Sequence, residues 1–226
     1  ILPEPPEPVI NVSSSSQTIT EGQSANILVD LRNEYYEDVM IGYTITGTST
    51  AGTDHDGTAS GVLIVPAGFG QGTIPIETFQ DSIYESNETL ILTLTTFSKC
   101  RPGASLVHTI TIQDDESPPT VTFDAASSSA YEDDGTVFVG VSLSVAQSTH
   151  LLIPYTVTGT AGGADHNLAN GTLTIFANST TGAFSILLTD DGVTEGYESV
   201  IITLSAPSGA FVGTPSVHTL GIYDPP

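Results

Sequence analysis

Hydrophobic and polar residues alternate with a period of two along most of this chain, in short runs rich in Val, Ile, Thr and Tyr. Clusters of Gly, Asn, Asp and Ser separate the runs, and no window combines the period and the length of a helix. A run of this kind buries one face and exposes the other, which is the pattern of an antiparallel β-strand. The alternation therefore predicts an all-β protein.

The runs in the first half predict seven strands, the first of them in two pieces. In chain order they cover residues 9–13 with 17–20, 24–31, 39–46, 59–65, 73–78, 89–96 and 107–113. Seven antiparallel strands in roughly 100 residues match the size of an immunoglobulin-like sandwich. We therefore expect a sandwich of this type in the first half of the chain.

The second half repeats the first at an offset of about 110 residues. Residues 43–48 (YTITGT) recur as residues 155–160 (YTVTGT), and residues 108–114 (HTITIQD) recur as residues 218–224 (HTLGIYD). A repeat of domain length indicates tandem copies of one fold. We expect a linker rich in Pro and Glu at residues 1–8, a first domain at 9–116 and a second at 117–226, both seven-stranded antiparallel immunoglobulin-like sandwiches.

The charge is strongly one-sided, with 26 Asp and Glu against three Lys and Arg and a net charge of -23. Internal ion pairs cannot neutralise such a surface, and it repels nucleic acid and anionic lipid. The hydrophobic fraction of 38% is that of a folded protein rather than of a disordered acidic tail. Metal cations are the natural counter-charge.

Alternating strand directions predict that many of the carboxylates meet at one end of each sandwich. If consecutive strands are antiparallel, three connections lie at that end: those between the first and second, the third and fourth, and the fifth and sixth predicted strands. The end of the last strand lies there too. In the first copy this end carries Glu21, Asp54, Asp81, Glu85, Glu88, Asp114 and Asp115. In the second copy it carries Glu132, Asp165, Asp190, Asp191, Glu195, Glu198 and Asp224.

A hard cation with many oxygen ligands suits such an acidic end. Calcium takes about six to eight oxygen ligands in a flexible geometry, whereas magnesium demands a stricter octahedron. Transition metals favour nitrogen or sulfur ligands, and none are convincingly placed in this sequence. We therefore expect Ca²⁺ as the cofactor.

The motifs resemble those of the Calx-β domain family, which occurs in sodium/calcium exchangers, the integrin β4 tail and long extracellular repeat proteins. The matching features of the first copy are Glu21-Gly22, a Gly-Thr segment that ends at Asp54, the acids from Asp81 to Glu88, and the closing pair Asp114-Asp115. The resemblance covers nearly the whole chain, twice over. It implies that the carboxylates named above for each copy are calcium ligands.

Two departures from the family pattern concern these ligand sets. The first copy has Gln80 before Asp81, where the family usually has a further acid, so one charge is removed. In the second copy the closing acids are reduced to Asp224 followed by Pro225 and Pro226, which removes a ligand. We therefore expect the two copies to bind calcium differently.

The preferred function is a structural calcium-binding module of a large extracellular adhesion or surface protein. Calcium would stiffen the joint between the domains, because Asp114 and Asp115 directly precede the connection to the second copy. The expected partners are neighbouring repeats of the same chain and a protein or glycan ligand, without nucleic acid or direct membrane insertion. No set of Ser, His and Asp suggests a nucleophile, so we do not expect an enzyme.

Two alternatives remain open at this point. One is a regulatory calcium sensor attached to a membrane transporter, and the other is an adhesin tip that binds glycan or protein directly, with Tyr35 and Tyr36 as a possible contact surface. Glycosylation sequons at Asn11, Asn87, Asn170 and Asn178 agree with an extracellular location if the source is eukaryotic. Asn87 is the least plausible glycan site, because it lies between two expected ligands.

Overall fold

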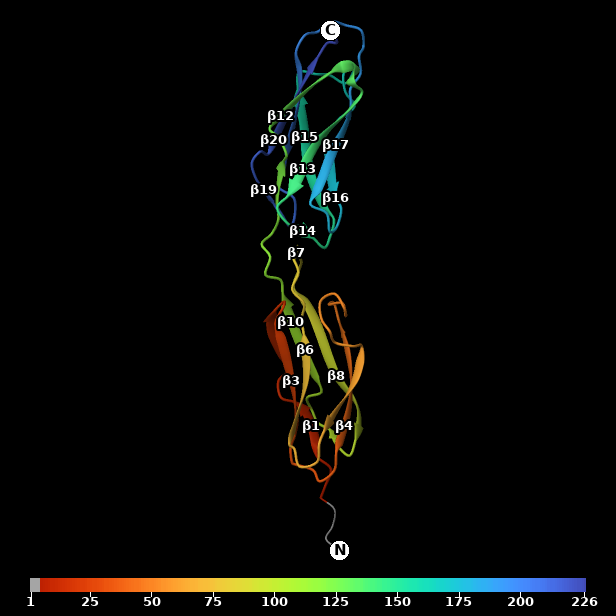
Figure 1. The fold of residues 1–226 in the computed structure, drawn as a ribbon, viewed down its shortest axis with the longest axis vertical. Helices are drawn as coiled ribbons and strands as arrows, with labels where there is room; N and C mark the ends of the chain where they lie inside the picture. Colours follow the sequence, from red (N-terminus) through yellow and green to blue (C-terminus); the bar gives the residue numbers. More distant parts are fainter. Residues whose placement is uncertain (1–4) are drawn as a thin grey trace. The chain divides into compact units, whose positions relative to one another are not determined.

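The structure, a computed structural model, describes residues 5–226. The chain divides into two compact units, of which the first comprises the chain up to Asp81 together with Ser86–Asp115. The second comprises Glu116–Pro226 and the short segment Ser82–Glu85. Figure 1 shows that each unit is built from strands, and the prediction of two β-sandwiches is confirmed. The linker expected at residues 1–8 lies partly outside the described residues.

The first unit contains two sheets that face each other. One sheet has the order β6-β3-β1-β9 and the other has the order β2-β10-β8-β4-β5. The strands are β1 (Val9–Val12), β2 (Ser16–Thr20), β3 (Ser24–Leu31), β4 (Val39–Gly47), β5 (Ser60–Val65), β6 (Gln71–Glu77), β8 (Glu88–Ser98), β9 (Arg101–Pro102) and β10 (Val107–Gln113). All seven strands predicted for this copy are present, with bounds that differ by a few residues.

The second unit repeats this topology, with sheets in the order β17-β13-β11-β19 and β12-β20-β18-β15-β16. Its strands are β11 (Thr120–Phe123), β12 (Ser127–Tyr131), β13 (Thr136–Leu143), β14 (Ala146–Gln147), β15 (Leu151–Gly159), β16 (Gly171–Ile175), β17 (Thr181–Leu187), β18 (Glu198–Leu204), β19 (Phe211–Val212) and β20 (Val217–Tyr223). The segment β7 (Ile83–Tyr84) is counted with this unit and pairs in parallel with β14. A short 3-10 helix, η1 (Glu132–Asp134), follows β12.

The first predicted strand of each copy changes sheets halfway along its length. In the first unit β1 pairs antiparallel with β3, whereas β2 joins the other sheet in parallel with β10. The second unit does the same with β11 and β12. In the first unit serines occupy the break, and the backbone N–H of Ser13 donates to the Leu28 carbonyl of β3 at 2.9 Å. The chain therefore contributes its first segment to both sheets of each sandwich.

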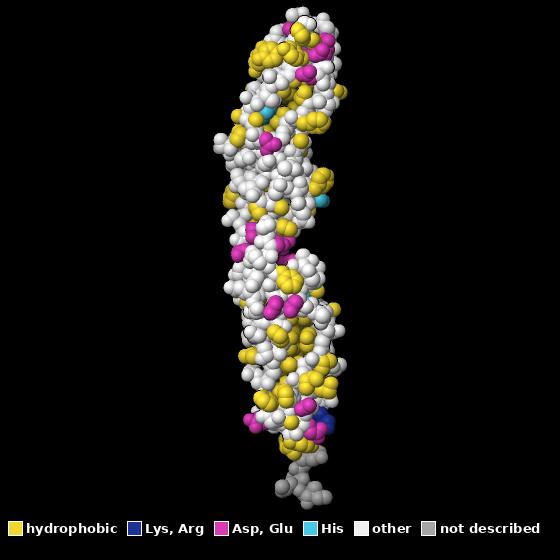
Figure 2. Space-filling model, in the orientation of Figure 1, with side chains coloured by type: hydrophobic (Ala, Val, Ile, Leu, Met, Phe, Trp, Pro, Cys, Tyr) yellow, Lys and Arg dark blue, Asp and Glu magenta, His cyan; other side chains and the backbone are white. Residues whose placement is uncertain are grey.

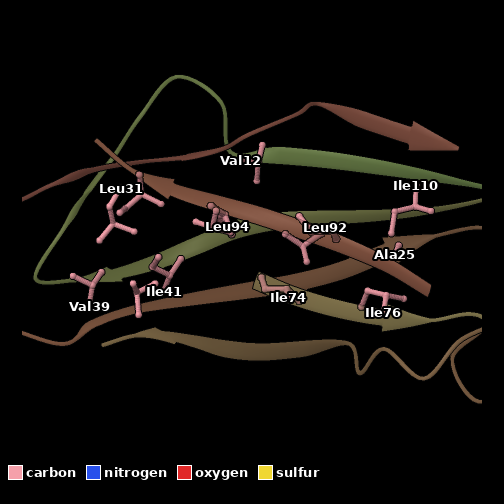
Figure 3. Packing of buried hydrophobic residues seen from close by; sticks show 14 of the residues in the cluster. Val12, Ala25, Leu31, Val39, Ile41, Ile74, Ile76, Leu92, Leu94 and Ile110 are labelled. Atoms are coloured by element: carbon pink, nitrogen blue, oxygen red, sulfur yellow. The ribbon is translucent and has the colours of Figure 1, made fainter. Parts of the chain in front are cut away.

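The core lies between the two sheets and is made by the inward residues of the alternating strands. Figure 3 shows Ile41 and Leu92 of one sheet facing Ile74 and Ile76 of the other. Burying such side chains contributes about 1.5–3 kcal/mol each. Tyr35 also belongs to this core, with only 7% of its surface exposed. The suggested contact surface of Tyr35 and Tyr36 is therefore wrong for Tyr35.

Strand register brings three loops and the end of the last strand together at one end of each unit. In the first unit Thr20 pairs with Gln113, Ile112 pairs with Glu88, and Ser24 pairs with Glu77. In the second unit the corresponding pairs are Tyr131 with Tyr223, Glu198 with Ile222, and Thr136 with Leu187. The acidic end that strand direction predicts is therefore present in both units. No helix among the described residues is long and apolar enough to cross a membrane.

Candidate metal centre

The acidic end of the second unit is formed by residues from five places in the chain. Glu132 opens η1, Asp165 lies between β15 and β16, and Glu198 begins β18. Asp190, Asp191 and Glu195 lie in the connection between β17 and β18, and Asp224 follows β20. The strands therefore fix where these loops begin and end, and the loops carry most of the carboxylates.

Asp165 is held in place by the backbone around it. Only 4% of its surface is exposed, and its carboxylate accepts a hydrogen bond from the Gly162 N–H. The backbone carbonyl oxygen of Asp165 accepts a hydrogen bond from the Thr189 N–H at 2.9 Å, which connects this loop to the segment after β17. A carboxylate restrained in this way points in one direction, as a ligand for an ion must.

Glu132 is a buried carboxylate without a donor. Only 2% of its surface is exposed, and neither of its carboxylate oxygens has a hydrogen-bond partner among the described residues. Burial raises the pKa of Glu132, and the charges of Asp224, Glu195, Asp190 and Asp165 raise that pKa further. A buried carboxylate among like charges is costly unless a proton or a cation compensates it. The surroundings of Glu132 therefore suit a bound cation.

Glu198, the first residue of β18, is also a carboxylate among like charges. Burial first, and then a hydrogen bond to Asp165 and the charges of Asp165, Glu195 and Glu132, together raise its pKa to about 7. One of its carboxylate oxygens, Oε2, is also buried without a hydrogen-bond partner. Together the two glutamates present three buried oxygens that a cation could use.

All seven carboxylates expected in the second copy interact at this end. Asp165, Asp191 and Glu195 each offer an oxygen, and these atoms lie within 4.8 Å of one another. Desolvation and the charges of Asp165, Asp191 and Asp224 raise the pKa of Glu195. An oxygen-rich set without nitrogen or sulfur suits Ca²⁺ better than a transition metal. The residues present therefore fit a calcium site.

The first copy brings its carboxylates together in two smaller groups. Glu21, Asp115 and Glu116 form one group and Asp54, Glu85 and Glu88 form the other, each with ligand atoms within 4.8 Å. Asp81 and Asp114, which were also expected as ligands, belong to neither group. Glu116 was not among the expected ligands, although it directly follows Asp115, and its Oε2 atom is buried without a hydrogen-bond partner.

Gln80 has a role that the sequence did not indicate. Its Nε2 group donates to Glu21 Oε1 at 2.8 Å and to Asp115 Oδ1 at 2.9 Å. The amide therefore stands between two carboxylates, where a cation could otherwise bridge them. The sequence showed only that a charge was missing at this position, not that the replacing amide donates to both neighbours.

Neither histidine near the acidic ends joins the ligand groups. His55 is only 2% exposed, and its Nδ1 atom accepts from the Gly57 N–H at 3.0 Å. His166 accepts in the same way from the Leu168 N–H at 3.1 Å. Both rings therefore support a loop of their own copy, the loop after β4 in the first and the loop after β15 in the second.

Comparison with known proteins finds one domain family twice along the chain. The Calx-beta domain family matches residues 6–116 and again residues 114–226. A crystal structure of CBD12 from CALX1.2 is 17% identical, with a TM-score of 0.45, and the match covers 94% of this chain and 98% of that one. A crystal structure of the apo-form Calx CBD1 domain is 26% identical, with a TM-score of 0.44, and covers 49% of this chain and 100% of that one. No curated protein sequence matches the chain.

Proposed function

The chain belongs to the Calx-beta family, and from this premise we propose that it is a calcium-binding repeat pair of a large extracellular adhesion or surface protein. Calx-beta domains are non-catalytic modules, in agreement with the expectation that the chain is not an enzyme. The observation that supports the proposal most strongly is Glu132, whose two buried oxygens lack donors among six other interacting carboxylates.

In the second copy Glu132, Asp165 and Glu198 would hold calcium from the buried side, and Asp190, Asp191, Glu195 and Asp224 from the loops. In the first copy Glu21, Asp54, Asp81, Glu85, Glu88, Asp114 and Asp115 remain the proposed ligands. Calcium supplies positive charge and further coordination at these ends. The fourteen carboxylates then no longer repel one another unopposed, and the loops that carry them become ordered.

Calcium binding in the first copy would also stiffen the connection to the second copy. Only residues 116–119 separate Asp115 from β11, and two of them are Pro118 and Pro119. Prolines restrict the backbone. A connection this short therefore keeps little conformational freedom once a bound ion fixes Asp115. The proposed outcome is a string of stiffly joined repeats, which suits an extracellular adhesion protein whose partners include its own neighbouring repeats.

Calorimetric titration of the whole chain with calcium tests the ligand assignment. We expect binding to the unmodified chain, and the Asp165→Asn, Asp191→Asn double variant should lose the binding that belongs to the second copy. A second variant, Asp81→Ala with Glu85→Ala, should lose the binding that belongs to the first copy. If both variants bind calcium as the unmodified chain does, the assigned ligands are wrong.

Replacing a chelator with calcium should raise the melting temperature of the chain. An ion present at about 100 times its dissociation constant stabilises the folded state by about 2.7 kcal/mol. For a domain of this size that corresponds to a shift on the order of 10 °C. X-ray scattering in the same two solutions should show a narrower range of interdomain angles with calcium, and no change in either measurement would refute the proposal.

A further inference from the structure

Three tyrosines form an exposed surface at the acidic end of the second copy. Tyr131, Tyr197 and Tyr223 are 46%, 57% and 43% exposed. The Tyr131 and Tyr223 rings are 6.4 Å apart, and the Tyr197 and Tyr223 rings are 5.3 Å apart, measured between centroids. We call these three residues the tyrosine surface. Figure 2 shows hydrophobic and acidic side chains next to each other where the chain ends.

The first copy has polar residues at all three positions. Tyr131 and Tyr223 are paired across β12 and β20, and the same place in the first copy pairs Thr20 with Gln113. Tyr197 precedes Glu198 at the start of β18, where Asn87 precedes Glu88 in the first copy. The shared fold therefore does not require aromatic residues here, and the tyrosine surface is a property of the second copy alone.

A glycine in the middle of a strand makes room for Tyr197. A Cβ atom at Gly221 would lie 2.7 Å from Tyr197 Cε2, which is too close for a real contact. Thr111 occupies this place in the first copy. Glycine in a strand interior weakens the strand and often marks a place of close approach. Gly221 therefore weakens its strand locally, but it leaves space for the Tyr197 ring.

Hydrogen bonds hold the tyrosine surface in its arrangement. The Asp224 carboxylate accepts from the N–H groups of Glu195 at 3.1 Å and Gly196 at 2.8 Å. These residues directly precede Tyr197, and Asp224 directly follows Tyr223, so the bonds hold the two rings together. The Tyr131 N–H donates to Asp134 Oδ2 at 2.7 Å. Rings restrained in this way lose little freedom when they bind a partner.

The surroundings of the rings are negative. Asp133 and Asp134 are exposed and follow Tyr131 within η1, and neither belongs to the proposed calcium ligands. Lys and Arg are absent from residue 117 to residue 226. The faces of aromatic rings attract cations, and nearby carboxylates strengthen that attraction. This negative charge remains when calcium neutralises the ligand groups.

We propose that the tyrosine surface binds an arginine-containing segment of another protein. A guanidinium group can stack on a tyrosine ring while its N–H groups donate to Asp133 and Asp134, and arginine does this better than lysine because its charged group is planar and less strongly hydrated. Stacked arginines and buried tyrosines are also frequent at the centres of protein interfaces. The carboxylates proposed to bind the arginine, Asp133 and Asp134, are not among the proposed calcium ligands.

The test measures binding of a fluorescently labelled peptide by anisotropy, in calcium, to the whole chain. The probe carries four arginines separated by Gly-Ser, and its neutral counterpart carries citrulline instead of arginine. The main variant combines Tyr131→Thr, Tyr197→Asn and Tyr223→Gln, which are the residues of the first copy. We expect this variant to bind the arginine peptide at least ten times more weakly, and the citrulline peptide to bind the unmodified chain weakly as well.

The control variant is Phe138→Asn, which removes another exposed aromatic side chain from β13, in the other sheet. Phe138 is 70% exposed, and the first copy has Asn26 at the matching position. This change should leave peptide binding unaltered. None of these substitutions of Tyr or Phe changes the net charge of -23, so general attraction of a cationic peptide to the acidic chain would be equal in these variants.

Equal binding by the unmodified chain and the triple variant would overturn the proposal. The proposal would also fail if the tyrosines were needed to bind a neutral oligosaccharide but not the arginine peptide. If the triple variant does not fold, the single Tyr197→Asn variant decides, because that residue lies outside the strands. It should weaken peptide binding several-fold, and Asp133→Asn should weaken it about two-fold.

Discussion

At the acidic end of the first copy an amide separates two carboxylates, whereas at the matching end of the second copy the carboxylates face one another. Gln80 donates to both Glu21 and Asp115. The second copy has Asp190 at the place of Gln80, and Glu132, the counterpart of Glu21, has no donor for either oxygen. The same fold can therefore compensate its clustered charge either with a fixed neutral donor or with a bound cation.

This difference predicts which copy depends more on calcium. A neutral donor is always present, so the Glu21 group of the first copy is partly satisfied without an ion. The buried oxygens of Glu132 and Glu198 have no such donor, so the second copy should gain more stability from calcium.

The largest effect should come from a feature that the two copies share. Gly47 and Gly159 have φ angles of 140° and 134°, and a Cβ atom at either would lie 2.0 Å from a backbone oxygen of the neighbouring strand. Gly47→Ala and Gly159→Ala should each lower the unfolding free energy of their own copy by at least about 2 kcal/mol. Thermal unfolding in calcium measures this, and a large loss in only one copy would show that the frameworks are not equivalent.

Glu132→Gln should change the stability of the second copy and not that of the first. Removing a buried, unpaired charge should raise the unfolding free energy of the second copy in chelator by about 1–3 kcal/mol. The new amide can also donate to neighbouring carboxylates, as Gln80 does. The same variant should gain less stability from calcium than the unmodified chain.

Glu21→Gln is the matched change in the first copy. Because Glu21 Oε1 already accepts from Gln80, this change should have a much smaller effect in chelator. Chemical denaturation with and without calcium measures both variants. A destabilised Glu132→Gln variant in chelator would contradict the charge argument.

Exchanging Gln80 and its counterpart Asp190 should make the calcium response of each copy more like that of the other copy. Gln80→Asp removes two hydrogen bonds to carboxylates and adds a like charge, so it should cost the first copy about 1–2 kcal/mol in chelator. Calcium should recover most of this loss. The reciprocal change, Asp190→Gln, should reduce the calcium response of the second copy, and calorimetry on both variants checks the exchange.

A further difference between the copies should be a pH dependence that Glu198 gives to the second copy. Burial and neighbouring charges raise the pKa of Glu198 to about 7, whereas an unfolded chain has a glutamate pKa of about 4.3. Between these two pH values the folded state binds more protons than the unfolded chain does. The free energy of unfolding without calcium should therefore fall as the pH rises. Calcium affinity should change in the opposite direction, because protons compete for the same oxygen.

Thermal unfolding in chelator at several pH values between about 5 and 8 measures this dependence. The Glu198→Gln variant is the control, because it lacks the titrating group and should show a flatter curve. The difference between the two curves isolates Glu198 from the general repulsion among the other carboxylates. Identical curves would mean that Glu198 is not the group responsible.

The strands and the shared acidic end could be predicted because both depend on simple periodic rules. Alternation places Ile41 and Leu92 in the core, and strand direction places Glu21, Asp115 and Glu88 at one end. The short strands β9 and β19 and the helix η1 could not be predicted, because two or three residues are too few for a period to appear.

The finer chemistry of the sites could not be predicted, because it depends on the exact path of the loops. Sequence alone gives no distance from the Gln80 amide to Glu21, and it does not show that Glu132 is buried while Asp133 beside it is exposed. The tyrosine surface depends in the same way on register, since Tyr131 and Tyr223 meet only because β12 pairs in parallel with β20.

That parallel pairing also determines how each sandwich responds to tension. The second half of the first strand lies beside the last strand over five residue pairs, from Thr109 with Ser16 to Gln113 with Thr20, and the second copy has five pairs in the same arrangement. A force that pulls the two ends of a sandwich apart acts along these strands. It shears all the hydrogen bonds between them at once, rather than opening them one after another. Each repeat therefore carries a mechanical clamp between its entry and exit segments.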